Sequence, residues 1–271
     1  MTRIWTLVWY WSLLILPFTA MITFVLTLVV CRQVLINNAG STVKLPNISV
    51  LGTGPAYNYF ISGFVILTPQ VSLIFISRLQ FLFQSQSIIH RAILYAIHAI
   101  SLLACVFLLI MAIVSLDHNN RLHLIGAIGM FALLCSYCSL HTIVAFYLFV
   151  RRLNAPRHSN ILWPLWFLVC CIVLIVCAGI WGATSKSIPQ YIAAAMPFLY
   201  IIGFVPQFWS QARMKIWNSG SSVEFTKETD SYKIINSVIT LPSLFKNSIP
   251  DLICSKYNDH HLPLTQSLFF L

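Results

Sequence analysis

The densest group of side chains able to do chemistry in this chain is one short polar segment between two long apolar stretches. It reads Asp117-His118-Asn119-Asn120-Arg121-Leu122-His123. A carboxylate beside two imidazoles can transfer protons or hold a zinc ion. However, the two histidines lie five positions apart at a helix entrance, and no second cluster completes a site. We therefore expect a structural or recognition role for Asp117, His118, Asn119 and His123, with Asp117 and Asn119 capping the next helix.

A second candidate site lies within the apolar stretch that follows. Cys135, Cys138 and His141 have i, i+3, i+6 spacing, so they share one broad helix face. Three such ligands suggest a metal, but a single helix rarely closes a metal site and no carboxylate supports this one. We interpret His141, and likewise His98, as buried imidazoles paired with a neighbouring hydroxyl or carbonyl. The sequence thus predicts no catalytic, metal or cofactor site.

The eight cysteines do not form a disulfide framework. Six of them fall inside apolar stretches, where small polarisable side chains serve as packing residues. Cys31 and Cys254 are expected near water, on opposite sides of the membrane. Gly126 and Gly129, and likewise Gly179 and Gly182, are expected where helix backbones approach one another.

The elements that position these residues follow from composition. The chain is 59% hydrophobic and only 8% charged, too few charges to cover a water-facing surface. Lipid must be the solvent, and hydrocarbon tolerates only helices or closed barrels. The continuous apolar runs, without strand-like alternation, predict helices. The net charge of +10 is scattered between apolar blocks, so nucleic-acid binding is not expected.

Six apolar stretches meet the length that a hydrocarbon core requires. The sequence predicts an all-α polytopic membrane protein whose six-helix transmembrane bundle fills residues 1–215, followed by a largely irregular cytoplasmic tail over 216–271. No Asp, Glu, Lys or Arg is expected inside a span, which argues against a pump or an ion-coupled carrier. The predicted spans cover about 4–30, 59–77, 92–116, 122–150, 161–183 and 191–211.

The loops between spans predict the orientation. With cytoplasmic termini, twelve Lys and Arg residues, Arg78 among them, lie on the cytoplasmic side and four on the other side. The long first loop, residues 31–57, then faces the lumen or the outside. It contains Asn47-Ile48-Ser49, the one N-glycosylation sequon of the chain, so glycosylation of Asn47 is expected. In the tail, Tyr232-Lys233-Ile234-Ile235 has the form of a sorting signal, read at Tyr232 and Ile235 by trafficking adaptors.

Two segments of the chain resemble the DRAM family, the damage-regulated autophagy modulators, with their Sfk-type and CWH-type relatives. Residues 45–56, LPNISVLGTGPA, are similar to the family segment Pro-x-Ile-Ser-x-x-Gly-x-x-Pro-Pro. Residues 117–127, DHNNRLHLIGA, are similar to its Asp-His-x-x-x-x-Leu-His-x-x-Gly-Ala motif. The six-span plan agrees. After Pro55 the chain has Ala56-Tyr57-Asn58 in place of Pro-Glu-Ser, which leaves the subfamily open.

The resemblance implies a non-enzymatic membrane regulator, most simply of the lysosomal membrane, with the Golgi and the plasma membrane as alternatives. Such a protein modulates autophagy or lysosomal function, or recruits a phosphoinositide kinase. Its expected partners are membrane lipids and, through the tail, trafficking adaptors or a lipid-kinase complex. One alternative is an enzyme that handles or remodels lipid, such as a GPI-anchor lipid, in which Asp117, His118 and His123 would act. A second alternative is a small passive channel.

Overall fold

The structure is a computed structural model that describes residues 3–39, 45–85, 89–151, 160–210 and 213. In these residues six helices are long and apolar enough to cross a membrane, and no strand is present. This confirms the predicted all-α fold, and the chain is an integral membrane protein. Two short elements, α2 (Ile48–Leu51) and η1 (Gly54–Ala56), interrupt the first loop. The long helices are α1 (Arg3–Ala39), α3 (Tyr57–Ser85), α4 (Arg91–Ile113), α5 (Asn120–Val150), α6 (Leu162–Thr184) and α7 (Ser187–Ile202).

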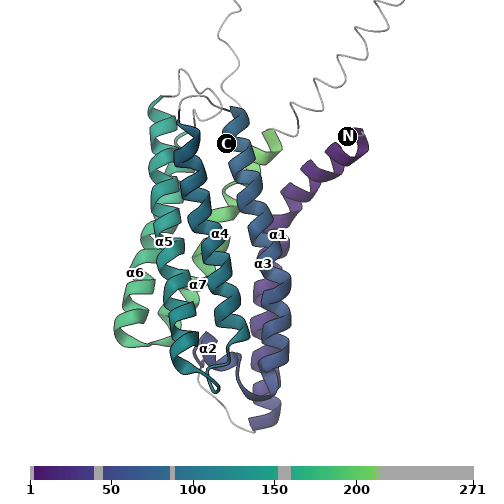
Figure 1. The fold of residues 1–271 in the computed structure, drawn as a ribbon, viewed down its shortest axis with the longest axis vertical. Coiled ribbons are helices and arrows are strands. Elements are labelled where there is room, and N and C mark those ends of the chain that lie inside the picture. The colour runs from purple at the N-terminus through teal and green to yellow at the C-terminus, as the bar shows by residue number, and fades with distance from the viewer. Residues whose placement is uncertain (1–2, 40–44, 86–88, 152–159, 211–212, 214–271) are drawn as a thin grey trace, which may run out of the picture. The chain divides into compact units, whose positions relative to one another are not determined.

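The long helices pack mostly against their neighbours in the chain. Helix α3 packs against α1 and α4, α5 packs against α4 and α6, and α6 packs against α7. The first and last long helices, α1 and α7, also contact each other. Figure 1 shows that α2 lies at one end of the bundle, whereas α1 begins and α7 ends toward the other. We call these the α2 end and the terminal end.

The outer surface of the bundle is as apolar as its interior. Large aliphatic side chains on the outside, such as Ile128, Ile143 and Val169, are more than half exposed. The interior combines aliphatic and small side chains with many aromatic ones, including Phe60, Phe75 and Phe167. A lipid solvent allows this distribution, because lipid tails are as apolar as an aliphatic side chain and exposing that side chain to them costs no hydrophobic free energy.

The helices extend beyond the apolar stretches that predicted them. Helix α1 continues to Ala39, α3 continues to Ser85, and α7 begins at Ser187. Backbone hydrogen bonding continues into polar sequence, so hydropathy marks the hydrocarbon-spanning part of a helix and not its ends. Arg78 therefore lies inside α3, within an apolar span, and only 1% of its surface is exposed. The predictions that no charged residue lies within a span and that Arg78 is a loop charge are wrong.

The first loop is also more ordered than expected in residues 45–56. Helix α2 and η1 fold back against α1, and Cys31 on α1 is fully buried with Sγ 3.8 Å from the carbonyl oxygen of Ala56. The expectation that Cys31 lies near water is therefore wrong. The seven described cysteines are free thiols. The predicted tail, with Cys254, Tyr232 and Ile235, lies outside the described residues.

Candidate functional site

The most unusual feature of the bundle interior is the buried guanidinium of Arg78. A cation inside a membrane helix costs several kcal/mol (roughly 3 kcal/mol or more) unless the protein supplies partners. The Nε of Arg78 donates to Nε2 of His141 on α5 at 2.9 Å, and its Nη1 donates to Oε1 of Gln207, just beyond α7. One side chain thereby links three helical segments that are far apart in the sequence.

The bond from Arg78 determines the tautomer of His141. A guanidinium can only donate, so Nε2 of His141 must accept and its proton lies on Nδ1. The Nδ1 atom lies 2.8 Å from the hydroxyl of Tyr200, which in turn donates to the carbonyl oxygen of Cys138 at 3.1 Å. Thr142 adds a contact of 3.0 Å to the same hydroxyl. The hydrogen bonds therefore run in one direction, from the cation to a backbone carbonyl. We call these five residues the Arg78 network: Arg78, Thr142, His141, Tyr200 and Gln207.

Aromatic rings complete the surroundings of the cation. The guanidinium carbon of Arg78 lies 5.1 Å from the ring centroid of Phe81 and 4.8 Å from that of Phe204. Ring faces carry partial negative charge, and such contacts gain strength when desolvated. No carboxylate contacts Arg78 among the described residues. The positive charge is thus held by neutral hydrogen-bond acceptors and ring faces.

A second polar pair adjoins the Arg78 network. His98 on α4 binds the carbonyl oxygen of Leu94 through Nδ1 at 2.9 Å, and its ring meets that of Tyr137 edge-on at 5.6 Å. The Tyr137 ring stacks on His141, with 5.6 Å between centroids. Within the described residues, His98 Nε2 and the Tyr137 hydroxyl have no hydrogen-bond partner. The prediction that His98 and His141 pair with a carbonyl or a hydroxyl is confirmed.

Cys135, Cys138 and His141 share a face of α5, but the ring of His141 is turned to other partners. Both ring nitrogens of His141 already face partners, Arg78 on one side and Tyr200 on the other. Within the described part of the chain, no group of His, Cys, Asp or Glu side chains is arranged to hold a metal ion.

The predicted polar segment before α5 divides into two parts. Asn119 caps α5, accepting from the amide of Leu122 at 3.1 Å, and His123 is buried with Nδ1 2.7 Å from the carbonyl oxygen of Val114. Asp117 and His118 lie exposed on the preceding turn. The expected capping role is therefore confirmed for Asn119 but not for Asp117. A recognition role for the segment stays a prediction.

The sequon residue Asn47 joins the first loop to α7. Its Oδ1 accepts from the hydroxyl of Ser187 at 2.8 Å, and its Nδ2 donates to the carbonyl oxygen of Ser185 at 3.3 Å. The next amide, that of Ile48, donates to Oε1 of Gln190 at 2.9 Å. We call this set of contacts the Asn47 clasp. It fixes α2 on the start of α7.

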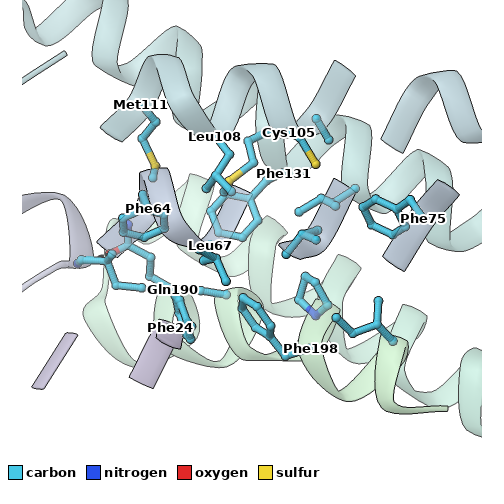
Figure 2. A pocket seen from close by; sticks show the side chains of 18 residues that line it. Phe24, Phe64, Leu67, Phe75, Cys105, Leu108, Met111, Phe131, Gln190 and Phe198 are labelled. Atoms are coloured by element: carbon cyan, nitrogen blue, oxygen red, sulfur yellow. Dashed lines mark hydrogen bonds between the residues drawn. The ribbon is translucent and has the colours of Figure 1, made fainter. Parts of the chain in front are cut away.

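An apolar cavity of about 70 Å³ lies inside the bundle, between the Asn47 clasp and the Arg78 network. Figure 2 shows Phe24, Phe64 and Gln190 toward one side of it and Phe75 on the other. Helices α1, α3, α4, α5 and α7 all contribute side chains, and Ile48 of α2 also lines the cavity. Gln190 is the one polar residue among those that line it.

Sequence reasoning missed Arg78, Tyr200, Gln207 and Gln190 as interior polar residues. A signal for the first was present, because Arg78 is a lone charge between apolar residues on both sides, in the run LIFISRLQFLF. No such signal marks the others, since Gln190 and Gln207 lie near the ends of the last span and Tyr200 is one aromatic residue among several within it.

Comparison with protein families gives one match. The family model described as the Frag1/DRAM/Sfk1/Cwh43P N-terminal domain matches residues 5–214, which includes the helices described above except the first two residues of α1. No curated protein and no solved structure matches the chain.

Proposed function

We propose that this chain, which belongs to the Frag1/DRAM/Sfk1/Cwh43P family, is a non-enzymatic membrane regulator of autophagy or lysosomal function. The observation that carries the proposal is the Arg78 network. Its polar atoms are turned toward one another and are buried from lipid and water, which suits control of helix arrangement better than contact with a substrate.

The position of the network suggests how regulation would reach the cytoplasm. Gln207 lies in the last helical segment, residues 205–210, only a few residues before the tail. A change in the Arg78–Gln207 contact would move this segment relative to α3. The tail would transmit that movement to its partners, which we propose to be trafficking adaptors or a lipid-kinase complex.

We propose cytoplasmic termini and residence in the lysosomal membrane. The excess of Lys and Arg in the loops at the terminal end supports this orientation and remains when Arg78 is removed from that set. The Tyr232–Ile235 pattern supports the location. The orientation is tested by protease treatment of intact organelles, in which a C-terminal tag must be cleaved. The location is tested by Tyr232→Ala with Ile235→Ala, which should redirect the protein to the plasma membrane.

The regulatory role is tested in cells that lack the protein. Autophagic flux is measured during starvation as turnover that lysosomal inhibitors block. Loss of the protein should change the flux, the full chain should restore it, and a chain ending at residue 213 should not. Abundance and location of each variant are measured in parallel, so that a folding defect is recognised. Unchanged flux without the protein would refute the autophagy role.

A further inference from the structure

The last membrane span is not one continuous helix. Helix α7 ends at Ile202, and residues 205–210, which we call the last segment, form a separate short helix. At the break the amide of Gly203 donates to the carbonyl oxygen of Tyr200, three residues back, at 3.1 Å. In a continuous α-helix the same amide would donate to Leu199. A short stretch of this tighter hydrogen bonding within a helix often marks a hinge.

The bundle accommodates this break inside the membrane. A carbonyl group that loses its helical donor in hydrocarbon needs another donor. For Leu199 the new donor is Nε1 of Trp166 on α6, which lies 3.0 Å from the carbonyl oxygen. Pro206 has no amide hydrogen, so it cannot join the last segment to α7 through the carbonyl oxygen of Ile202. The interruption is therefore built into the fold.

The last segment is held on the bundle by side-chain contacts with α3. Oε1 of Gln207 accepts a hydrogen bond from Nη1 of Arg78. The ring of Phe208, which is only 1% exposed, meets the ring of Phe81 edge-on, with 6.4 Å between centroids. Apolar contacts have little directionality, whereas a hydrogen bond is directional. The bond to Arg78 therefore fixes the position of the segment.

Gln207 has room for a second position. Together with Asn160, which precedes α6, it borders a space of about 10 Å³. A space of that volume has room for about one water-sized group. Oδ1 of Asn160 accepts from the amide of Leu162 at 2.9 Å, so Nδ2 is the donor group of that side chain. Movement of Gln207 into this space would exchange Arg78 for Asn160 as the donor to Oε1.

We propose that residues 203–206 form a hinge and that the Arg78–Gln207 hydrogen bond is its latch. In the closed position, which the structure shows, Gln207 pairs with Arg78. In the open position Gln207 pairs with Asn160, and the last segment turns toward α6. Arg78 keeps its bond to His141 in both positions, so the cation always has an acceptor. The role of the hinge in cells rests on the proposed regulatory function, which this inference deepens by naming the element that moves.

Hydrogen–deuterium exchange of the purified full-length chain in lipid nanodiscs tests the hinge. Peptides that cover residues 203–210 are compared with peptides that cover residues 190–201 of α7. Amides of the last segment should exchange about tenfold faster than those of α7, because opening of the hinge exposes them. Equal protection of the two stretches would overturn the hinge. Since the purified protein is measured, a failure of the hinge is distinguished from a failure of the autophagy role.

Two substitutions at one position test the latch. Gln207→Glu places a carboxylate against Arg78, and an ionised acceptor makes a hydrogen bond roughly twice as strong as a neutral one. Exchange of the last segment should slow about tenfold in Gln207→Glu and accelerate about tenfold in Gln207→Leu. Exchange of residues 190–201 should stay unchanged in both variants. An equal acceleration of both stretches in Gln207→Leu would indicate general destabilisation and would overturn the latch.

Pro206→Ala and Asn160→Ser test the two remaining parts of the proposal. Pro206→Ala supplies an amide for the carbonyl oxygen of Ile202, so it should join the last segment to α7 and slow its exchange severalfold. Asn160→Ser keeps a side-chain acceptor for the start of α6 but is too short to reach Gln207. It should therefore disfavour the open position and also slow exchange. Unchanged or faster exchange would overturn the hinge in the first variant and the second position of Gln207 in the other.

Discussion

The Nε of Arg78 lies 2.9 Å from Nε2 of His141, deep within a bundle whose outer surface is apolar. This pair joins α3 to α5, two helices that are not neighbours in the chain. Because the guanidinium cannot accept a hydrogen bond, the contact holds His141 as a neutral imidazole protonated on Nδ1. Because Nδ1 of His141 is the donor, the hydroxyl oxygen of Tyr200 on α7 accepts from it, and the hydroxyl proton is directed at the carbonyl oxygen of Cys138.

Arg78→Met should destabilise the bundle. The change removes a buried cation, but it leaves acceptors on His141 and Gln207 without donors, at about 1–3 kcal/mol each. We expect the thermal unfolding midpoint of the detergent-solubilised chain to fall by several degrees. Arg78→Met combined with His141→Leu should lose less than the sum of the two single changes, because the pair is coupled. Additive losses would contradict this coupling.

Tyr200→Phe should cost about 1–2 kcal/mol of unfolding free energy. The change removes the hydroxyl that contacts His141, Thr142 and the carbonyl oxygen of Cys138, with little change in volume. The matched control is Tyr147→Phe, since Tyr147 is an exposed residue of the same helix bundle. Thermal unfolding of both variants, measured side by side, should shift for Tyr200→Phe alone.

In the polar segment before α5, replacing a buried residue should lower protein abundance, whereas replacing exposed residues should not. His123→Ala should lower the abundance of the protein, because it breaks the contact with Val114 and opens a buried space. Asp117→Ala with His118→Ala should leave abundance unchanged, since both side chains are exposed. Immunoblots of membrane fractions measure this difference.

The same exposed pair tests the enzyme alternative. If the segment carries out lipid chemistry, Asp117→Ala with His118→Ala should abolish lipid turnover at normal abundance. Unchanged lipid composition in those cells supports the regulatory proposal instead. Lipid extracts analysed by mass spectrometry decide between the two outcomes.

Asn47 offers a test that separates glycosylation from folding. Asn47→Ala should destabilise the chain by about 1–3 kcal/mol because it breaks the Asn47 clasp, whereas Ser49→Ala removes the sequon and leaves the clasp intact. If Asn47 is glycosylated, Ser49→Ala and endoglycosidase treatment should produce the same increase in gel mobility. Equal thermal unfolding of the two variants would contradict a structural role for the clasp.

Much of this architecture follows from local sequence alone. The number of spans, their approximate positions and the helical class follow from the length of uncharged apolar stretches, because lipid forces the backbone to satisfy its own hydrogen bonds. Hydrogen-bond partners that lie within a few residues in the sequence were also predictable from local sequence. His98 bonds the carbonyl oxygen four residues earlier, and Asn119 caps the helix that it precedes.

Which face of each helix points inward was decided only by the tertiary structure. Gly126 lies against α4, where an added Cβ would be 2.9 Å from the backbone nitrogen of Met111, as expected for a helix contact. Gly179 and Gly182 were expected in similar contacts, but a Cβ on either would meet no atom within 4 Å. Lipid and protein interior are equally apolar, so hydrophobic periodicity does not mark the buried side of a membrane helix. For that reason the sequence determined the spans, whereas the packing of α3, α5 and α7 decided that Arg78 is buried among neutral partners.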